Sequence, residues 1–226
     1  MNWNDHSALK STHAFLSPST ISWLNYEDDK LESKLQERYF TSNRTLMGTA
    51  LHEFAADCIT MKLRLSTAKD RGTKISLIQM IDMYLKAKDY SIAFIDFVSV
   101  LPDEVFQTLI AYVNDGIRYR MDAEKILYYS YNCYGTADAI AFTNGVLRIS
   151  DLKTGTTPAH MEQLMIYAAL FCLEYNRKPG DIKIELRLYQ NGEILEFQPT
   201  AEDILPVMNR IIAADKILSK MKNGEE

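Results

Sequence analysis

The feature that most constrains the fold of this chain is the pair Asn144-Gly145, which lies between two β-prone runs. Asn-Gly in this setting is typical of a two-residue type I′ turn, because both turn residues need positive φ. We therefore predict a β-hairpin around this pair. Counting outward from the turn places Asp138 directly opposite Asp151, on one face of the sheet.

The two opposed carboxylates create an electrostatic problem at the end of the hairpin. Directly opposed Cβ atoms are about 4.5–5.5 Å apart, and like charges at that separation are destabilising. Lys153 lies two residues after Asp151, so its side chain points to the same face. A divalent cation would relieve the repulsion, because it binds carboxylate oxygens. The alternative is a solvated hairpin end, with Lys153 in an ordinary surface ion pair.

The order of helical and β-rich segments predicts one α/β (α+β) domain over residues 1–226. Helices are expected over 17–26, 46–65, 75–90 and 102–121, from caps and apolar spacing. Strands are expected over 125–131, 136–142 and 146–152, then a helix over 157–175, a hairpin over 182–197 and a helix over 201–221. Residues 1–122 are thus mainly helical, 123–200 hold the sheet and one helix, and 201–226 hold the last helix. This order predicts a mixed central sheet flanked by helices.

Composition limits the classes of protein that fit. The net charge of −5 does not indicate nucleic-acid binding, yet residues 30–74 hold nine Lys/Arg against five Asp/Glu. The apolar run 165–173 is too short to span a bilayer and no signal region is present, so we expect a cytoplasmic protein. Three cysteines, Cys58, Cys133 and Cys172, form no CxxC pair and are too few for a four-cysteine iron–sulfur cluster.

A histidine is a further candidate ligand. His52 follows Gly48 by four residues, so both share one face of a predicted helix. Glycine inside a helix costs about 0.5–1 kcal/mol relative to alanine, and its usual reason is close approach of another segment or a ligand. A neutral imidazole beside such a gap can bind a metal. The alternative is a histidine that is satisfied in the core or at the surface.

A polar pair lies in the strongly apolar helix that follows the Asp-x-Lys strand. Gln163 and Tyr167 are four residues apart, so they share a helix face. Their position suggests a common polar task, such as contacting a phosphate or a nucleophilic water. The alternative is a Gln–Tyr pair that is satisfied within the core.

Four short motifs in this order resemble the PD-(D/E)xK nuclease superfamily, specifically its RecB-like branch. They are G-x3-H at 48–52, GTAD at 135–138, ISDLKTG at 149–155 and Q-x3-Y at 163–167. That branch includes the RecB nuclease domain, CRISPR adaptation nucleases and phage recombination exonucleases. The resemblance covers residues 46–170 and implies a restriction-endonuclease-like core.

The resemblance implies a role for each matched residue. The ligands of Mg²⁺ or Mn²⁺ would be His52, Asp138, Asp151 and the backbone carbonyl of Leu152. Lys153 would orient the attacking water and offset charge on the phosphate. The catalytic set would comprise Asp138, Asp151, Lys153, Gln163 and Tyr167, and the residues contacting nucleic acid would be Arg44, Thr49, Gln163 and Tyr167.

The activity implied is metal-dependent hydrolysis of DNA by an exonuclease of recombination or repair. The missing iron–sulfur cysteines favour the phage or viral enzymes of the branch, with a single-strand annealing protein as a candidate partner and linear duplex or single-stranded DNA as substrate. Two alternatives stay open. One is a structure-specific or nicking endonuclease of the same fold, and the other is a DNA-binding module that does not cleave. Retention of two opposed carboxylates disfavours the binding module.

Overall fold

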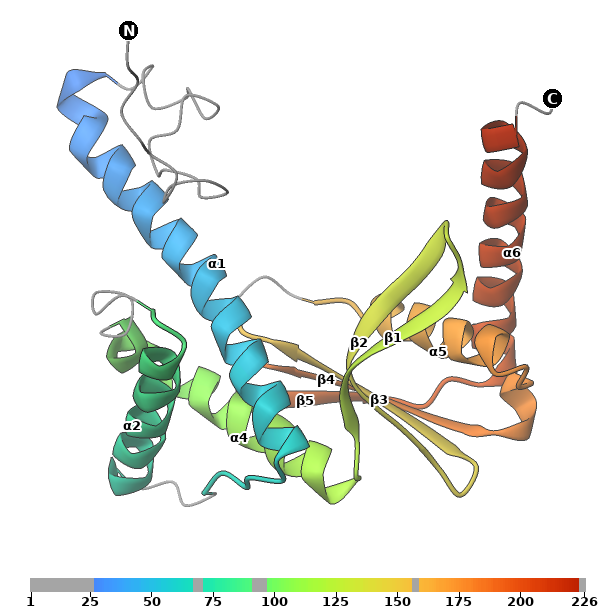
Figure 1. The fold of residues 1–226 in the computed structure, drawn as a ribbon, viewed down its shortest axis with the longest axis horizontal. Coiled ribbons are helices and arrows are strands. Elements are labelled where there is room, and N and C mark those ends of the chain that lie inside the picture. Colours follow the sequence, from blue (N-terminus) through green and yellow to red (C-terminus); the bar gives the residue numbers. More distant parts are fainter. Residues whose placement is uncertain (1–26, 67–70, 91–96, 156–158, 224–226) are drawn as a thin grey trace, which may run out of the picture. The chain divides into compact units, whose positions relative to one another are not determined.

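The computed structural model describes residues 27–66, 71–90, 97–155 and 159–223 (Figure 1). The chain divides into two compact units, residues 1–46 and 47–226. The described part of the first unit holds η3 (Asp28–Lys30) and the beginning of helix α1 (Leu31–Thr60). The predicted helix over 17–26 lies outside the described residues.

The second unit is built on a five-stranded sheet in the order β1-β2-β3-β4-β5. The strands are β1 (Asp122–Ser130), β2 (Cys133–Thr143), β3 (Val146–Lys153), β4 (Lys183–Gln190) and β5 (Glu193–Phe197). Neighbouring strands are antiparallel except for β3 and β4, which are parallel. Parallel neighbours need a crossover connection, and helix α5 (Glu162–Glu174) lies between these two strands in the chain. The prediction of a mixed central sheet flanked by helices is confirmed.

The predicted turn of the β2–β3 hairpin is also confirmed, and so is its register as far as Ala139 and Ser150. The predicted pair Asp138–Asp151, one step further from the turn, is not part of the ladder. Asn144 and Gly145 have φ of 52° and 75°, as a type I′ turn requires. The paired ladder runs from the residues beside the turn to Ala139 and Ser150. Counting outward from the turn, Asp138 is the residue of β2 next to Ala139, and it lies beyond the last of these pairs. At this point β1 and β2 turn away from the rest of the sheet (Figure 1).

One face of the sheet is covered by helices from the first half of the chain. These are α1 from Met47 onward, α2 (Arg71–Ala87) and α4 (Asp103–Arg118), with η4 (Phe97–Val100) before α4. In α4 the buried residues Phe106, Leu109, Tyr112 and Val113 recur at helical spacing, so one stripe faces the sheet. They pack in one core with Leu152 and other residues of the sheet.

The opposite face of the sheet is covered by α5 and α6 (Ala201–Asn223), with η5 (Pro179–Asp181) between α5 and β4 (Figure 1). Alternate residues of β3 and β4 point into this second core, because strand side chains alternate between faces. They include Leu147, Ile149, Leu186 and Leu188.

Three predicted helix starts are wrong. Helix α2 begins at Arg71, not at residue 75. Helix α1 begins at Leu31, not at residue 46, because its first half lacks the apolar spacing on which the prediction relied. Helix α5 begins at Glu162; Ala159 and His160 are not helical, and the proposed cap at 157–158 lies outside the described residues. Three ends also differ by a few residues, since α1 ends at Thr60, α2 at Ala87 and α4 at Arg118.

Candidate active site

The two aspartates lie together where β2 and β3 separate. Asp138 accepts a hydrogen bond on Oδ2 from the Leu152 N–H, at 3.0 Å. Asp151 is buried, with only 2% of its side chain exposed, and its Oδ1 and Oδ2 lie 3.1 and 2.9 Å from Lys153 Nζ. The ion pair of Lys153 is therefore not an ordinary surface pair, and the alternative of a solvated hairpin end is wrong for Asp151.

A line of polar contacts joins this ion pair to α5. Lys153 Nζ donates to Gln163 Oε1 at 3.1 Å, and Gln163 Nε2 donates to the Tyr167 hydroxyl at 3.3 Å. The ring of Tyr167 packs against Gly135 of β2, where a Cβ would lie 3.0 Å from Cε1. Gln163 is exposed and Tyr167 is half-buried, so the alternative of a pair enclosed in the core does not describe them.

His52 reaches the same place from α1. Its Nδ1 lies 3.4 Å from Asp138 Oδ2, and the imidazole also hydrogen-bonds to the backbone of Leu152. The close approach expected at Gly48 is present, because a Cβ at that position would lie 2.9 Å from Thr154 Oγ1. Gly48 thus lets α1 approach the end of β3, which carries Asp151 and Lys153.

Burial controls the protonation of these groups. Burial raises the pKa of Asp138, while the hydrogen bond from the Leu152 N–H and the charge of Lys153 act in the opposite direction and lower it. It also raises the pKa of Asp151, and repulsion from Asp138 raises it further, while Lys153 and His52 act in the opposite direction. Two carboxyl groups that disfavour joint ionisation are therefore held together.

The imidazole shows the opposite response. Burial lowers the pKa of His52 below 6.5, and attraction to Asp151 offsets only part of this effect. His52 is therefore neutral at pH 7, which is the state that binds a metal ion.

Two residues near the aspartates were not singled out from the sequence. Glu124 lies opposite Asp138 in the β1–β2 register and has a φ of 51°, unusual for a residue within a strand. Burial, followed by repulsion from Asp138, raises the pKa of Glu124. The predicted strand started at residue 125, one residue after Glu124, so no predicted register paired Glu124 with Asp138.

Tyr112 of α4 is the second of these residues. It is buried, and burial followed by repulsion from Asp138 and Asp151 raises its pKa well above 10. Its spacing in α4 marks only an apolar helix face, so no sequence signal connects it to the aspartates.

Two further residues of α1, Arg44 and Thr49, were expected to contact nucleic acid. Thr49 is exposed on α1, three residues before His52. Arg44 belongs to the first unit, and its side chain lies outside the described part of the chain.

The donor set has the residue types that bind a hard divalent cation, although its side chains are not gathered as metal ligands in the arrangement observed. It offers two carboxylates that a positive charge would relieve, one neutral imidazole, and the Leu152 backbone beside that imidazole. In the described ranges, no three His, Cys, Asp or Glu side chains are gathered closely enough to hold a metal ion. Lys153 contacts Asp151, and His52 contacts Asp138, in the arrangement observed.

The thiols take no part in this group. Cys58 and Cys172 are buried, Cys133 is half-buried, and all three are free. Burial raises the pKa of Cys58 and of Cys172 to about 11, so neither is a thiolate at neutral pH.

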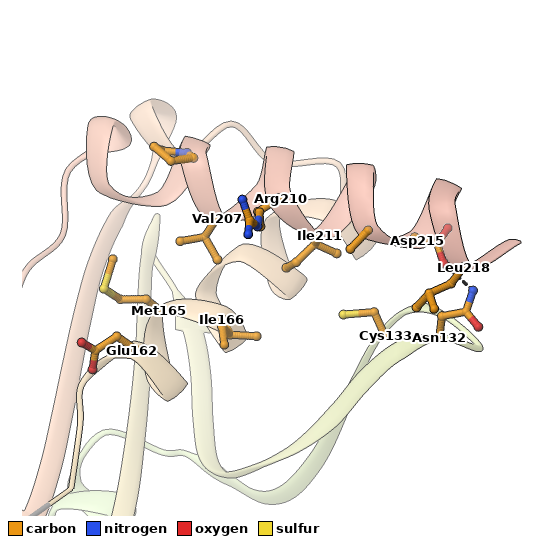
Figure 2. Close-up of a pocket in the computed structure, with 12 residues that line it drawn as sticks. Asn132, Cys133, Glu162, Met165, Ile166, Val207, Arg210, Ile211, Asp215 and Leu218 are labelled. Atoms are coloured by element: carbon orange, nitrogen blue, oxygen red, sulfur yellow. Dashed lines mark hydrogen bonds between the residues drawn. The ribbon is translucent and has the colours of Figure 1, made fainter. Parts of the chain in front are cut away.

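A separate pocket of about 650 Å³ lies between the β1–β2 turn, α5 and α6 (Figure 2). Its walls are mainly apolar side chains such as Met165, Val207 and Ile211, with Glu162, Arg210 and Asp215 among the charged ones. Glu162 precedes Gln163 in the chain, but the aspartates and Lys153 do not line this pocket.

Across the described residues, no helix is long and apolar enough to cross a membrane.

The fold and the site define an α+β protein with a buried aspartate, a partly exposed aspartate and a lysine at one end of a mixed sheet. The model of the family described as "Protein of unknown function (DUF2800)" matches residues 13–208, and the chain belongs to this family. No curated protein matches the chain.

Proposed function

We propose that this protein is a divalent-metal-dependent deoxyribonuclease, and specifically a DNA exonuclease of recombination or repair. The observation that supports it best is the convergence of His52, Asp138, Asp151 and Lys153, which come from α1, β2 and β3. A buried carboxylate, Asp151, held beside the partly exposed Asp138 is costly for folding, which favours a chemical purpose over a structural one. The proposal includes the RecB-like, restriction-endonuclease-like core suggested by the sequence motifs.

Mg²⁺ or Mn²⁺ would be held by Asp138, Asp151, His52 and the carbonyl of Leu152. Such an ion supplies positive charge to a phosphodiester and lowers the pKa of a water molecule. Burial leaves His52 neutral, which is the form that binds a metal ion. A cation would also relieve the repulsion from Asp138 that contributes to the raised pKa of Asp151.

Lys153 would act on the reacting groups. Its ammonium lies 3.1 Å from Gln163 Oε1, which holds it at the edge of the site and not only against Asp151. In hydrolysis, the oxygen of water bonds to phosphorus, the P–O ester bond breaks, and the departing oxygen takes a proton. A lysine in this place can orient the water and offset the charge that develops on the phosphate oxygens.

Gln163 and Tyr167 would position the DNA backbone from α5. Both are accessible, and the hydrogen bond between them fixes their side chains relative to Lys153. We place the reaction in the cytoplasm, which is the cytoplasm of the host if the protein is of phage origin. The substrate is DNA, and a single-strand annealing protein is a candidate partner. Arg44 and Thr49 are proposed to add contacts to DNA.

Incubation with linear, nicked circular and closed circular DNA tests the proposal, each with Mg²⁺, with Mn²⁺ and with EDTA. We expect degradation of linear DNA only when a metal is present, and none by the Asp151→Asn variant. Asp181→Asn is the matched control, because Asp181 is an exposed acid in η5. Cleavage of closed circles would instead indicate an endonuclease. No cleavage of any DNA under these conditions would contradict the proposal.

A further inference from the structure

The side chain of Gln190, the last residue of β4, joins the chain that leaves β3 to the chain that enters α5. Its Nε2 donates a hydrogen bond to the Gly155 carbonyl at 2.7 Å, and its Oε1 accepts one from the Ala159 N–H at 3.2 Å. A carbonyl only accepts and an N–H only donates, so the two bonds together fix the orientation of the amide. We call these two hydrogen bonds the Gln190 clamp.

The two clamped residues lie between Lys153 and Gln163 in the chain. Gly155 follows Lys153 by two residues, and Ala159 precedes Gln163 by four. Gln190 itself lies opposite Lys153 in the parallel register of β3 and β4. The clamp therefore ties the end of β3 and the approach to α5 to one residue, at the level of the lysine.

The chain on both sides of Gln190 is fixed to α4. Tyr189 is fully buried, and its hydroxyl donates to Asp115 Oδ2 at 2.9 Å. The Gly192 N–H donates to the hydroxyl of the buried Thr108 at 2.7 Å. Gln190 thus lies between two anchored residues, so its amide is a rigid support for the segments that it clamps.

The contact that depends on this support is the one between Lys153 Nζ and Gln163 Oε1, at 3.1 Å. Lys153 also contacts both carboxylate oxygens of Asp151. Asp151 cannot hold a cation and the lysine with the same oxygens, so Gln163 would remain to place the ammonium once a metal is bound. Displacing a reacting group by about 1 Å can cost about 10²-fold in rate, so the position of Gln163 then matters for hydrolysis.

We infer that Gln190 is a positioning residue of the candidate active site: by clamping Gly155 and Ala159, it holds Gln163 where Gln163 places the Lys153 ammonium. Gln190 acts through these two side chains and exchanges no proton with the substrate. The effect on cleavage rests on the proposed function, whereas the clamp itself can be measured in the metal-free protein.

Gln190→Met tests the clamp, because methionine has nearly the length of glutamine but forms neither hydrogen bond. In EDTA, amide hydrogen exchange followed by NMR should be about 2- to 13-fold faster at Ala159 in this variant, which is the factor that one typical hydrogen bond gives. The NMR signals of the Gln163 side-chain amide should also shift. Gln198→Met is the matched control, since Gln198 is an exposed glutamine directly after β5, and it should leave both readouts as in the parent.

Cleavage assays test the effect of the clamp on the reaction. With saturating Mn²⁺ and saturating linear DNA, Gln190→Met should cleave about 10- to 10²-fold more slowly than the parent. It should keep the rise in Tm that Mn²⁺ gives the parent, because it changes none of the proposed metal ligands. A double-mutant cycle with Gln163→Ala separates positioning from general destabilisation. If Gln190 acts through Gln163, Gln190→Met should slow the Gln163→Ala protein by less than about twofold.

Three results for Gln190→Met would overturn the inference. They are unchanged Ala159 exchange and Gln163 signals, an unchanged cleavage rate, and equal slowing of cleavage in the parent and in the Gln163→Ala protein.

Should Gln190→Met not fold, Gln190→Glu takes its place, because glutamate keeps the acceptor for Ala159 but cannot donate to Gly155 when it is ionised. This variant should keep the slow exchange at Ala159 and still cleave more slowly than the parent; a rate equal to the parent's would overturn the inference. A parent that cleaves no DNA would refute only the proposed nuclease activity, because faster Ala159 exchange with shifted Gln163 signals in EDTA would still support the clamp.

Discussion

Replacing Asp151 with asparagine is the sharpest test of the metal site, because it separates charge from shape. The asparagine has nearly the same volume as the buried aspartate but cannot supply a negative charge to a cation. Repulsion from Asp138 is removed, while Lys153, with 30% of its side chain exposed, can still reach solvent. We therefore expect the metal-free variant to be at least as stable as the metal-free parent near neutral pH.

The sign of this expectation follows from the pKa of Asp151, which burial and Asp138 raise above 3.8. A group whose pKa is raised on folding binds more protons in the folded state, so stability falls as pH rises through the folded pKa. Between about pH 4 and pH 7, the metal-free parent should thus lose more stability than Asp151→Asn does. An equal loss of stability in the two proteins would contradict the inference that burial and Asp138 raise the pKa of Asp151.

Metal should reverse the order of stability. Free metal at 100 times its Kd stabilises the folded state by about 2.7 kcal/mol. For a chain of 226 residues, each kcal/mol shifts Tm by about 2–4 °C, so the parent should gain roughly 5–11 °C. The variant should gain almost nothing, and the control Asp181→Asn should gain as much as the parent. Thermal unfolding followed by circular dichroism, in EDTA and in Mn²⁺, measures both shifts; a parent that gains nothing would refute the site.

Three further variants test the roles of individual residues. Lys153→Ala should keep the Mn²⁺-induced rise in Tm but cleave DNA about 10²–10³-fold more slowly, because the lysine acts on the reacting groups; loss of the rise would contradict that role. Parent affinity for Mn²⁺, measured by calorimetry, should fall with decreasing pH only below about 6.5, since burial lowers the pKa of His52. His52→Ala should weaken Mn²⁺ binding at neutral pH and flatten the part of the pH dependence of Mn²⁺ affinity that comes from the imidazole. If His52 is only a core residue, the variant would keep the parent's Mn²⁺ affinity and pH dependence. Gly48→Ala should gain up to about 1 kcal/mol of helix propensity yet lose cleavage, because its Cβ would lie 2.9 Å from Thr154 Oγ1. Adding Thr154→Ala should restore cleavage if that contact is the cause.

The β2–β3 hairpin was predictable because its information is local. Asn144-Gly145 alone sets the turn, and the turn sets the pairing of every residue outward to Ala139 and Ser150. The same local pattern explains the hairpin predicted over 182–197, whose turn residues Asn191 and Gly192 also have positive φ. Helix starts were less predictable, since the first half of α1 has no apolar stripe that would mark it.

The residues around the aspartates were harder to predict, because their contacts depend on strand pairing and helix packing. Glu124 lies opposite Asp138 only through the β1–β2 register, and that register shifts near the turn, between Tyr128 and Ser130. Counting from that turn would therefore have given the wrong partner. Tyr112 has the spacing of an ordinary core residue, and only the packing of α4 on the sheet brings it near the acids.

If the proposed nuclease activity is correct, the charges around Asp151 give a physical reason for metal to bind before DNA. Asp138, Asp151 and Lys153 together carry one net negative charge when His52 is neutral. A phosphodiester also carries one negative charge, so the metal-free group repels it. A divalent cation would change the sum to one positive charge and would compete with Lys153 for Asp151. The lysine would then be free to turn toward the phosphate from its contact with Gln163, which lies outside the buried carboxylate pair.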